Sequence, residues 1–142
     1  MVAANSLFVD TAGWASILGR DETHHRAMTR AYRQAVEQRR RLLTSNYILT
    51  GVVALLSSRA VVPRQRMIAF IDVLKAAPHL RILYVDQIID EAAWNLLKVR
   101  RDKDWSLVDA SSFILMQQHG VTEALTTDHH FSQAGFTRLP DL

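Results

Sequence analysis

Short apolar runs that are typical of strands alternate with helix-like segments from one end of this chain to the other. We expect strands at residues 7–10, 41–44, 80–85, 121–126 and 136–139. We expect helices at residues 11–18, 22–40, 46–58, 63–76, 88–99, 106–119 and 128–133. Such alternation is typical of a parallel sheet with helices on both faces. The sequence therefore predicts an α/β fold, a three-layer α/β/α sandwich with a mostly parallel central sheet.

Length and composition narrow the class of protein. A chain of 142 residues predicts a single domain over residues 1–142. The absence of cysteine excludes a disulfide scaffold and a thiolate metal site. No apolar run approaches the roughly 20 residues that cross a bilayer, and the first residues lack the pattern of a signal peptide. We therefore expect a cytoplasmic protein with no membrane association.

The basic residues are unevenly distributed. The net charge is +3, and seven arginines lie between Arg20 and Arg41. A second basic group lies at residues 98–103. These groups are explained equally well by solvated helix faces or by a surface that follows phosphate groups, because arginine pairs well with phosphate oxygens.

Three aspartates occupy positions where parallel sheets bind ligands. Asp10 and Asp128 each follow a strand-like run, and Asp109 lies in the first turn of a predicted helix. Ligands of open parallel sheets lie beyond the carboxyl ends of the strands. Three carboxylates together repel one another unless a cation is bound, and oxygen ligands without cysteine suit Mg²⁺ or Mn²⁺ better than zinc.

A purely structural explanation of the same aspartates remains open. Aspartate is a preferred N-cap, and Asp10 and Asp128 both precede predicted helices. Ser106 and Asp109 have the spacing of a capping box. Asp86 has a similar strand-end position, and we interpret it as a cap alone.

Three segments together resemble the PIN domain, and more narrowly the VapC-type toxins of bacterial toxin–antitoxin systems. They are Phe8-Val-Asp10-Thr, Trp105-Ser-Leu-Val-Asp109-Ala-Ser-Ser-Phe113 and Leu125-Thr-Thr-Asp128-His-His-Phe131. The resemblance covers essentially the whole chain, and the two C-terminal segments are its most specific part. It implies an α/β/α sandwich and a metal-dependent ribonuclease activity.

The resemblance also implies roles for particular residues. Asp10, Asp109 and Asp128 would bind Mg²⁺ or Mn²⁺ and activate water for attack at phosphorus. Thr126 or Thr127 would supply a hydroxyl beside the metal ligands. Asp104 is either a further carboxylate near the site or a solvated acid at the start of a helix.

One position departs from the family pattern. The segment Thr44-Ser-Asn-Tyr-Ile-Leu-Thr50-Gly51 resembles the family segment that ends in glutamate, the second metal-binding acid, and Gly51 stands in its place. Glycine inside a helix costs about 1 kcal/mol relative to alanine, and no turn follows that would require it. Either this substitution cripples a toxic nuclease, naturally or by introduction to permit expression, or the chain has diverged and works with three acids. We expect weak or no nuclease activity.

The implied partners are an RNA substrate, a cognate antitoxin that blocks the site and a second copy of the chain. The apolar face at residues 68–74 and the helix at residues 52–56 are candidates for burial in such contacts. A second hypothesis is a degenerate, non-catalytic PIN-like module that binds RNA or a protein through its arginine-rich helix.

We predict only minor functional roles for the remaining aromatic and histidine residues. Adjacent side chains on a helix point about 100° apart, so the pairs at residues 24–25 and 129–130 are poor chelates. The second pair lies beside Asp128 and is the better candidate for substrate contact. For Trp14, Tyr47, Trp105 and Phe113 we favour packing.

Overall fold

A computed structural model describes residues 5–19, 23–59 and 62–142. Its strands are β1 (Ser6–Val9), β2 (Arg41–Ser45), β3 (Leu80–Leu83), β4 (Glu123–Leu125) and β5 (Thr137–Leu139). Its helices are α1 (Thr11–Leu18), α2 (His25–Glu37), α3 (Asn46–Arg59), α4 (Arg64–Ala76), α5 (Gln87–Val99), α6 (Leu107–Gln118) and α7 (His130–Gln133). No helix in the described ranges is long and apolar enough to cross a membrane.

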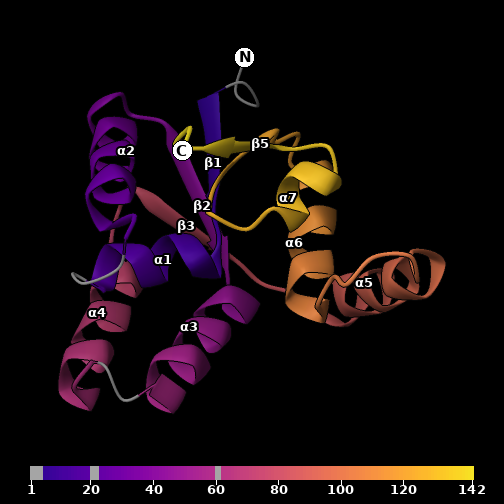
Figure 1. Ribbon diagram of the computed structural model, residues 1–142, viewed down its shortest axis with the longest axis horizontal. Helices are drawn as coiled ribbons and strands as arrows, with labels where there is room; N and C mark the ends of the chain where they lie inside the picture. Colours follow the sequence, from indigo (N-terminus) through magenta and orange to yellow (C-terminus); the bar gives the residue numbers. More distant parts are fainter. Residues whose placement is uncertain (1–4, 20–22, 60–61) are drawn as a thin grey trace.

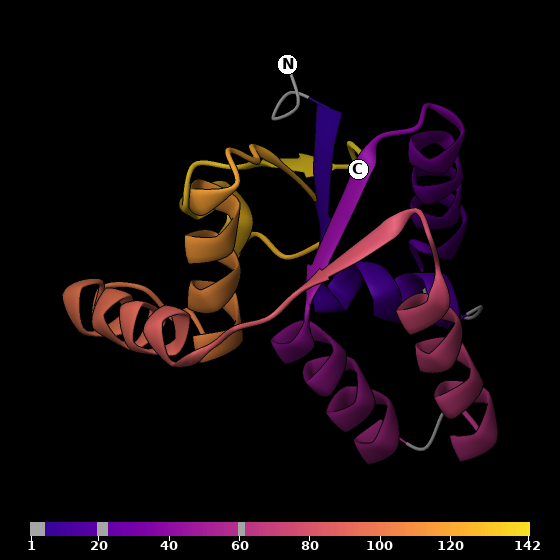
Figure 2. The same ribbon diagram turned by 180° about the vertical axis from the view of Figure 1, so that it is seen from behind.

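The strands form one sheet in the order β3-β2-β1-β4-β5, and every neighbouring pair is parallel. Helices α1, α2 and α4 lie on one side of the sheet and α5, α6 and α7 on the other, while α3 extends from its lower edge (Figure 1). The view from behind shows the same layers (Figure 2). The predicted three-layer α/β/α fold is confirmed.

The order of the strands creates a natural ligand site. After β1 the chain adds β2 on one side, and later returns to add β4 on the other side of β1. The helical connections therefore diverge beyond the carboxyl ends of β1 and β4, which is where open α/β sheets bind ligands. Asp10 directly follows β1, and Thr126 directly follows β4.

Two close contacts fix the carboxyl end of β1. A Cβ atom on Gly13 would collide with the carbonyl oxygen of Leu125, so only glycine lets α1 pass so close to the end of β4. The buried Thr44 hydroxyl donates to the Val9 carbonyl at 2.9 Å and accepts from the Trp14 indole at 3.1 Å. The favoured packing role of Trp14 is thereby confirmed.

Several predicted details differ from the structure. The helix predicted at residues 22–40 ends at Glu37, because Arg39 has a positive φ of 56° that a helix cannot contain; its predicted start at residue 22 lies outside the described residues. Pro63 precedes α4 instead of opening it. The strand predicted at residues 80–85 ends at Leu83.

The burial of two apolar helices was also overestimated. Ile68 is 47% exposed, although the periodicity of α4 predicts that it points inward. Helix α3 is apolar almost all round, a pattern that predicts burial on every side, but only one face is covered: Val52 and Leu56 are buried and Ala54 is exposed. Helix α3 projects beyond the edge of the sheet, so the sheet cannot cover its other face (Figure 1).

Candidate active site

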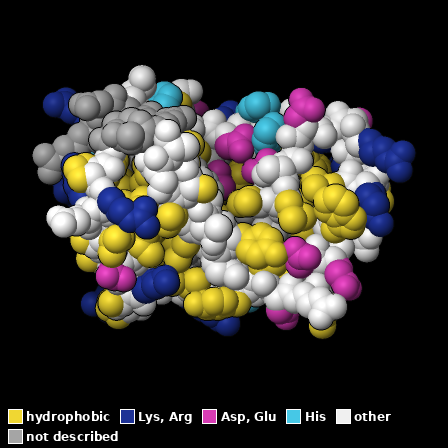
Figure 3. Space-filling view, turned by 90° about the horizontal axis from the view of Figure 1, so that it is seen from below, with side chains coloured by type: hydrophobic (Ala, Val, Ile, Leu, Met, Phe, Trp, Pro, Cys, Tyr) yellow, Lys and Arg dark blue, Asp and Glu magenta, His cyan; other side chains and the backbone are white. Residues whose placement is uncertain are grey.

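Three aspartates from distant parts of the chain meet beyond the carboxyl ends of the strands. Asp10 follows β1, Asp128 lies in the loop after β4, and Asp109 lies in the first turn of α6. The carboxylates of Asp109 and Asp128 both act electrostatically on Asp10. Figure 3 looks onto the underside of the molecule, where acidic and histidine side chains gather beside one another. The structure therefore brings together the three aspartates that the sequence singles out.

Asp10 is the most buried of the three, with only 3% of its surface exposed. Its pKa is raised to about 7: burial is the main cause, hydrogen bonds from the Thr126 hydroxyl and the Thr11 backbone oppose it, and repulsion by Asp109 and Asp128 adds to it. The Thr126 hydroxyl donates to Asp10 Oδ2 at 2.9 Å and accepts from the Asp128 N–H at 3.0 Å. This hydroxyl therefore links the ends of β1 and β4.

Asp109 combines capping with a position in the site. Its Oδ2 accepts from the Ser106 N–H at 3.0 Å, and its own N–H donates to Ser106 Oγ at 3.0 Å. These bonds form the predicted capping box. Burial raises the pKa of Asp109, and the hydrogen bond from the Ser106 backbone opposes that effect. The capping and site explanations of Asp109 are thus compatible.

His130 lies between two of the aspartates. Its ring nitrogen Nδ1 is 3.1 Å from Asp109 Oδ2 and 3.1 Å from Asp128 Oδ1. Its backbone N–H donates to Asp128 Oδ1 at 2.9 Å. The chelate argument from the sequence underrated this residue, because His130 needs no help from His129 to reach the carboxylates. Its position two residues after a strand-end aspartate is the signal that could have found it.

The other predicted residues divide between the site and its surroundings. Thr126 is buried against Asp10, whereas the Thr127 carbonyl accepts from Arg138 at 2.9 Å. Asp104 is exposed and makes no hydrogen bond or ion pair with the described residues. The side chain of His129 is 68% exposed, and its Nδ1 is 3.9 Å from Asp128 Oδ1.

Gly51 faces the start of α1. A Cβ atom at this position would lie 3.2 Å from Thr11 Oγ1 and 3.7 Å from Thr11 Cγ2. Thr11 directly follows Asp10, and its backbone hydrogen bond acts on the Asp10 carboxylate. A side chain at position 51 would therefore start beside the residue pair that carries the most buried aspartate.

The residues of this cluster fit a divalent cation. Within the described ranges, no lysine or arginine forms an ion pair with Asp10, Asp109 or Asp128, although the pKa of Asp10 shows how poorly its charge is offset. Carboxylate oxygens are ligands of hard cations such as Mg²⁺ and Mn²⁺. A bound cation would supply the positive charge that the cluster itself lacks.

Comparisons with known proteins agree with this geometry. The family model described as PIN domain matches residues 7–137. The 23S rRNA-specific endonuclease VapC20 of Mycobacterium tuberculosis is 28% identical over 133 residues, which cover 94% of this chain and 97% of that protein.

Two crystal structures are similar in fold. The structure of Mycobacterium tuberculosis VapC20, titled a sarcin–ricin loop cleaving toxin, has a TM-score of 0.81 at 28% identity and covers 92% of this chain and 96% of that one. FitAcB from Neisseria gonorrhoeae has a TM-score of 0.64 at 16% identity, and the match covers 94% of this chain and 96% of that one, which supports the fold alone. The motifs, the sheet order and the family match lead to one conclusion: the chain belongs to the PIN domain family.

Proposed function

We propose that this chain is a VapC-like ribonuclease toxin that hydrolyses RNA with a divalent cation, Mg²⁺ or Mn²⁺, held by Asp10, Asp109 and Asp128. The observation that carries the proposal is the convergence of these carboxylates at the carboxyl end of the sheet, with the pKa of Asp10 raised to about 7. When bound, such a cation activates water and offsets negative charge on the leaving oxygen.

The chain's own residues hold the carboxylates in place for that chemistry. Thr126 fixes Asp10, the Ser106 N–H fixes Asp109, and the His130 N–H fixes Asp128. Among the described residues, none hydrogen-bonds to Asp109 Oδ1 or Asp128 Oδ2, so neither carboxylate has both of its oxygens occupied. Asp104 and Thr127 would act at a distance, through the substrate or solvent.

The substrate proposed for this chain is the sarcin–ricin loop of 23S rRNA. The basis is the similarity to VapC20 along almost the whole length of both proteins. Two polar hollows offer arginines to phosphates. Arg138, held by Ser132 Oγ at 2.7 Å, lines a hollow of about 410 Å³ beside Thr126, and α2 lines another with Arg26, Arg30 and Arg33.

The glycine at position 51 lowers the rate of RNA cleavage that we expect. We propose that the missing carboxylate at this position weakens cation binding and cleavage, and that glutamate there would restore both. The close approach of position 51 to Thr11 supports this idea, because Thr11 directly follows Asp10 in the chain. The competing proposal, a non-catalytic PIN-like module that binds RNA or a protein, draws on the same missing acid.

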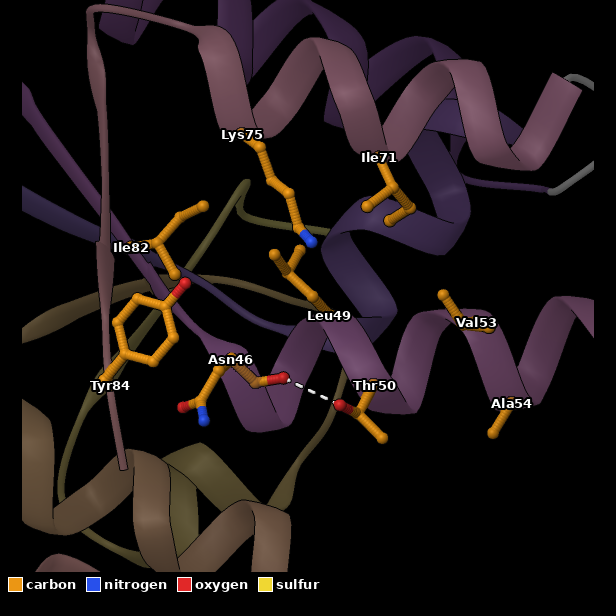
Figure 4. Close-up of a pocket in the computed structure, with 9 residues that line it drawn as sticks. All are labelled: Asn46, Leu49, Thr50, Val53, Ala54, Ile71, Lys75, Ile82 and Tyr84. Atoms are coloured by element: carbon orange, nitrogen blue, oxygen red, sulfur yellow. Dashed lines mark hydrogen bonds between the residues drawn. The ribbon is translucent and has the colours of Figure 1, made fainter. Parts of the chain in front are cut away.

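Partner proteins are proposed for an apolar surface between α3 and α4. A groove of about 440 Å³ lies between α3, α4 and the end of β3, with Leu49, Val53, Ile71 and Tyr84 in its wall (Figure 4). Tyr84 is 69% exposed. We propose that this surface binds a cognate antitoxin or a second copy of the chain. We also propose that the protein is cytoplasmic. Measuring the mass of the protein in solution tests whether it forms a dimer.

Cleavage of ribosomal RNA tests the function. The chain, Gly51→Glu and Gly51→Glu with Asp109→Asn would be incubated with ribosomes and a synthetic sarcin–ricin RNA in Mg²⁺, Mn²⁺ or EDTA. We expect Gly51→Glu to cut within the loop, EDTA and Asp109→Asn to abolish cutting, and the unmodified chain to cut more slowly. Cutting no faster by Gly51→Glu than by the unmodified chain would refute the role given to position 51. Cation binding without cutting of either RNA would favour the non-catalytic module.

A further inference from the structure

The environment of His130 differs from that of its neighbour. Its side chain is 20% exposed, and Nδ1 faces two carboxylate oxygens from different elements, Asp109 Oδ2 of α6 and Asp128 Oδ1 of the loop after β4. The backbone N–H of His130 also donates to Asp128 Oδ1 at 2.9 Å, which fixes the loop relative to the ring. His129 has a largely exposed ring and lies farther from the same oxygen.

The distances at Nδ1 match those between ligands of one cation. Octahedral bonds of about 2.0 to 2.2 Å place neighbouring ligand atoms about 2.8 to 3.1 Å apart. Both separations from His130 Nδ1 to the carboxylate oxygens are 3.1 Å. Nδ1 and each of the two carboxylate oxygens therefore have the separation of neighbouring ligands of one cation.

We propose that His130 is a nitrogen ligand of the divalent cation, bound through Nδ1 alongside Asp109 and Asp128. This inference rests on the proposed metal site and adds a ligand that the carboxylate pattern does not contain. The imidazole binds in its neutral form with the proton on Nε2, because only an unprotonated nitrogen has a lone pair for a metal. In a chain with glycine at position 51, His130 raises the number of protein ligands from three to four.

A nitrogen ligand changes which metal the site prefers. Imidazole binds transition-metal ions better than it binds Mg²⁺, which takes oxygen ligands, and of the two cations considered Mn²⁺ is the transition-metal ion. We therefore expect His130→Ala to weaken Mn²⁺ binding by roughly tenfold or more, the scale of effects seen when residues supporting a metal site are changed. Mg²⁺ binding should fall much less. His129→Ala is the matched control, because it removes an adjacent imidazole and should change neither affinity.

Pulsed electron paramagnetic resonance of bound Mn²⁺ tests the ligand directly. The unmodified chain should show the ¹⁴N modulation of a coordinated imidazole. His129→Ala should retain it and His130→Ala should lose it. Since the first spectrum needs no substitution, it tests the proposal even if His130→Ala fails to fold. Isothermal titration calorimetry with Mn²⁺ and Mg²⁺ gives the dissociation constants for the same proteins and for Asp109→Asn.

The outcomes separate this inference from the function on which it rests. If the unmodified chain binds no Mn²⁺, or if Asp109→Asn binds it equally well, the proposed metal site is wrong and the inference fails with it. If Asp109→Asn abolishes binding but the unmodified chain shows no ¹⁴N modulation, the metal site stands and His130 only donates a hydrogen bond to the carboxylates. Modulation that persists in His130→Ala also overturns the inference.

Discussion

Replacing Gly51 by glutamate is the perturbation with the clearest expected gain. The new side chain starts 3.2 Å from the Thr11 hydroxyl, so that hydroxyl must move by a few tenths of an ångström. Removing glycine from the interior of α3 stabilises the helix by roughly 0.5–1 kcal/mol. Without a cation, repulsion between the new carboxylate and the carboxylates of Asp10, Asp109 and Asp128 offsets that gain in stability.

With a cation the balance reverses. A further ligand is expected to tighten Mn²⁺ binding by about 10- to 100-fold, which corresponds to about 1.4 to 2.7 kcal/mol. At Mn²⁺ concentrations above both dissociation constants, the same difference adds to the free energy of unfolding. For a domain of this size it raises the melting temperature by roughly 4 to 8 °C.

The assay compares Gly51→Glu with Gly51→Gln, which has nearly the same shape and helix propensity but no charge. Melting temperatures are measured in EDTA and in Mn²⁺, and titration calorimetry gives the dissociation constants. We expect the rise in melting temperature from EDTA to Mn²⁺ to be larger in Gly51→Glu than in Gly51→Gln by roughly 4 to 8 °C. Equal Mn²⁺ affinities in the two variants would refute the proposal that position 51 lacks a metal-binding carboxylate.

Three further substitutions test the structure around the site, each followed by urea unfolding in EDTA. Folded Asp10 keeps its proton up to about pH 7, whereas the unfolded chain loses it near 3.8, so its contribution to stability is complete below about pH 4 and is lost as the pH rises through 7. Asp10→Asn should remove up to about 4 kcal/mol of this pH dependence. If the free energy of unfolding varies with pH in the same way in the unmodified chain and in Asp10→Asn, the raised pKa is contradicted. Thr126→Val removes the donor to Asp10 and the acceptor for Asp128, and should cost roughly 1–3 kcal/mol; unchanged stability would show that this link is dispensable. Thr44→Val leaves the Trp14 indole without its acceptor and should cost a similar roughly 1–3 kcal/mol, so a change below about 0.5 kcal/mol would count against that contact.

The fold and the three aspartates were predictable because each leaves a local signal. Asp10 and Asp128 follow apolar strand-like runs, and Ser106 with Asp109 has capping-box spacing. The parallel sheet then follows from the alternation of strands and helices, and it brings the carboxyl ends of its strands to one edge. These residues could be placed without knowing any side-chain contact.

Other features depend on contacts between distant segments. The need for glycine at position 13 comes from the Leu125 carbonyl, which lies far away in the sequence. The choice between Thr126 and Thr127 depends on which hydroxyl faces Asp10. The exposure of Ile68 depends on which elements cover that face of α4. Periodicity records which side chains are apolar, but it contains no information on which neighbour covers them.

The position of a bound cation is the most direct test of the account. Crystals of the protein grown with Mn²⁺ would be measured at wavelengths above and below the manganese absorption edge. We predict an anomalous peak within bonding distance of Asp10, Asp109 and Asp128, with His130 Nδ1 also in contact. A peak elsewhere, or none at this cluster with Mn²⁺ well above its measured dissociation constant, would contradict the assignment of these aspartates as metal ligands.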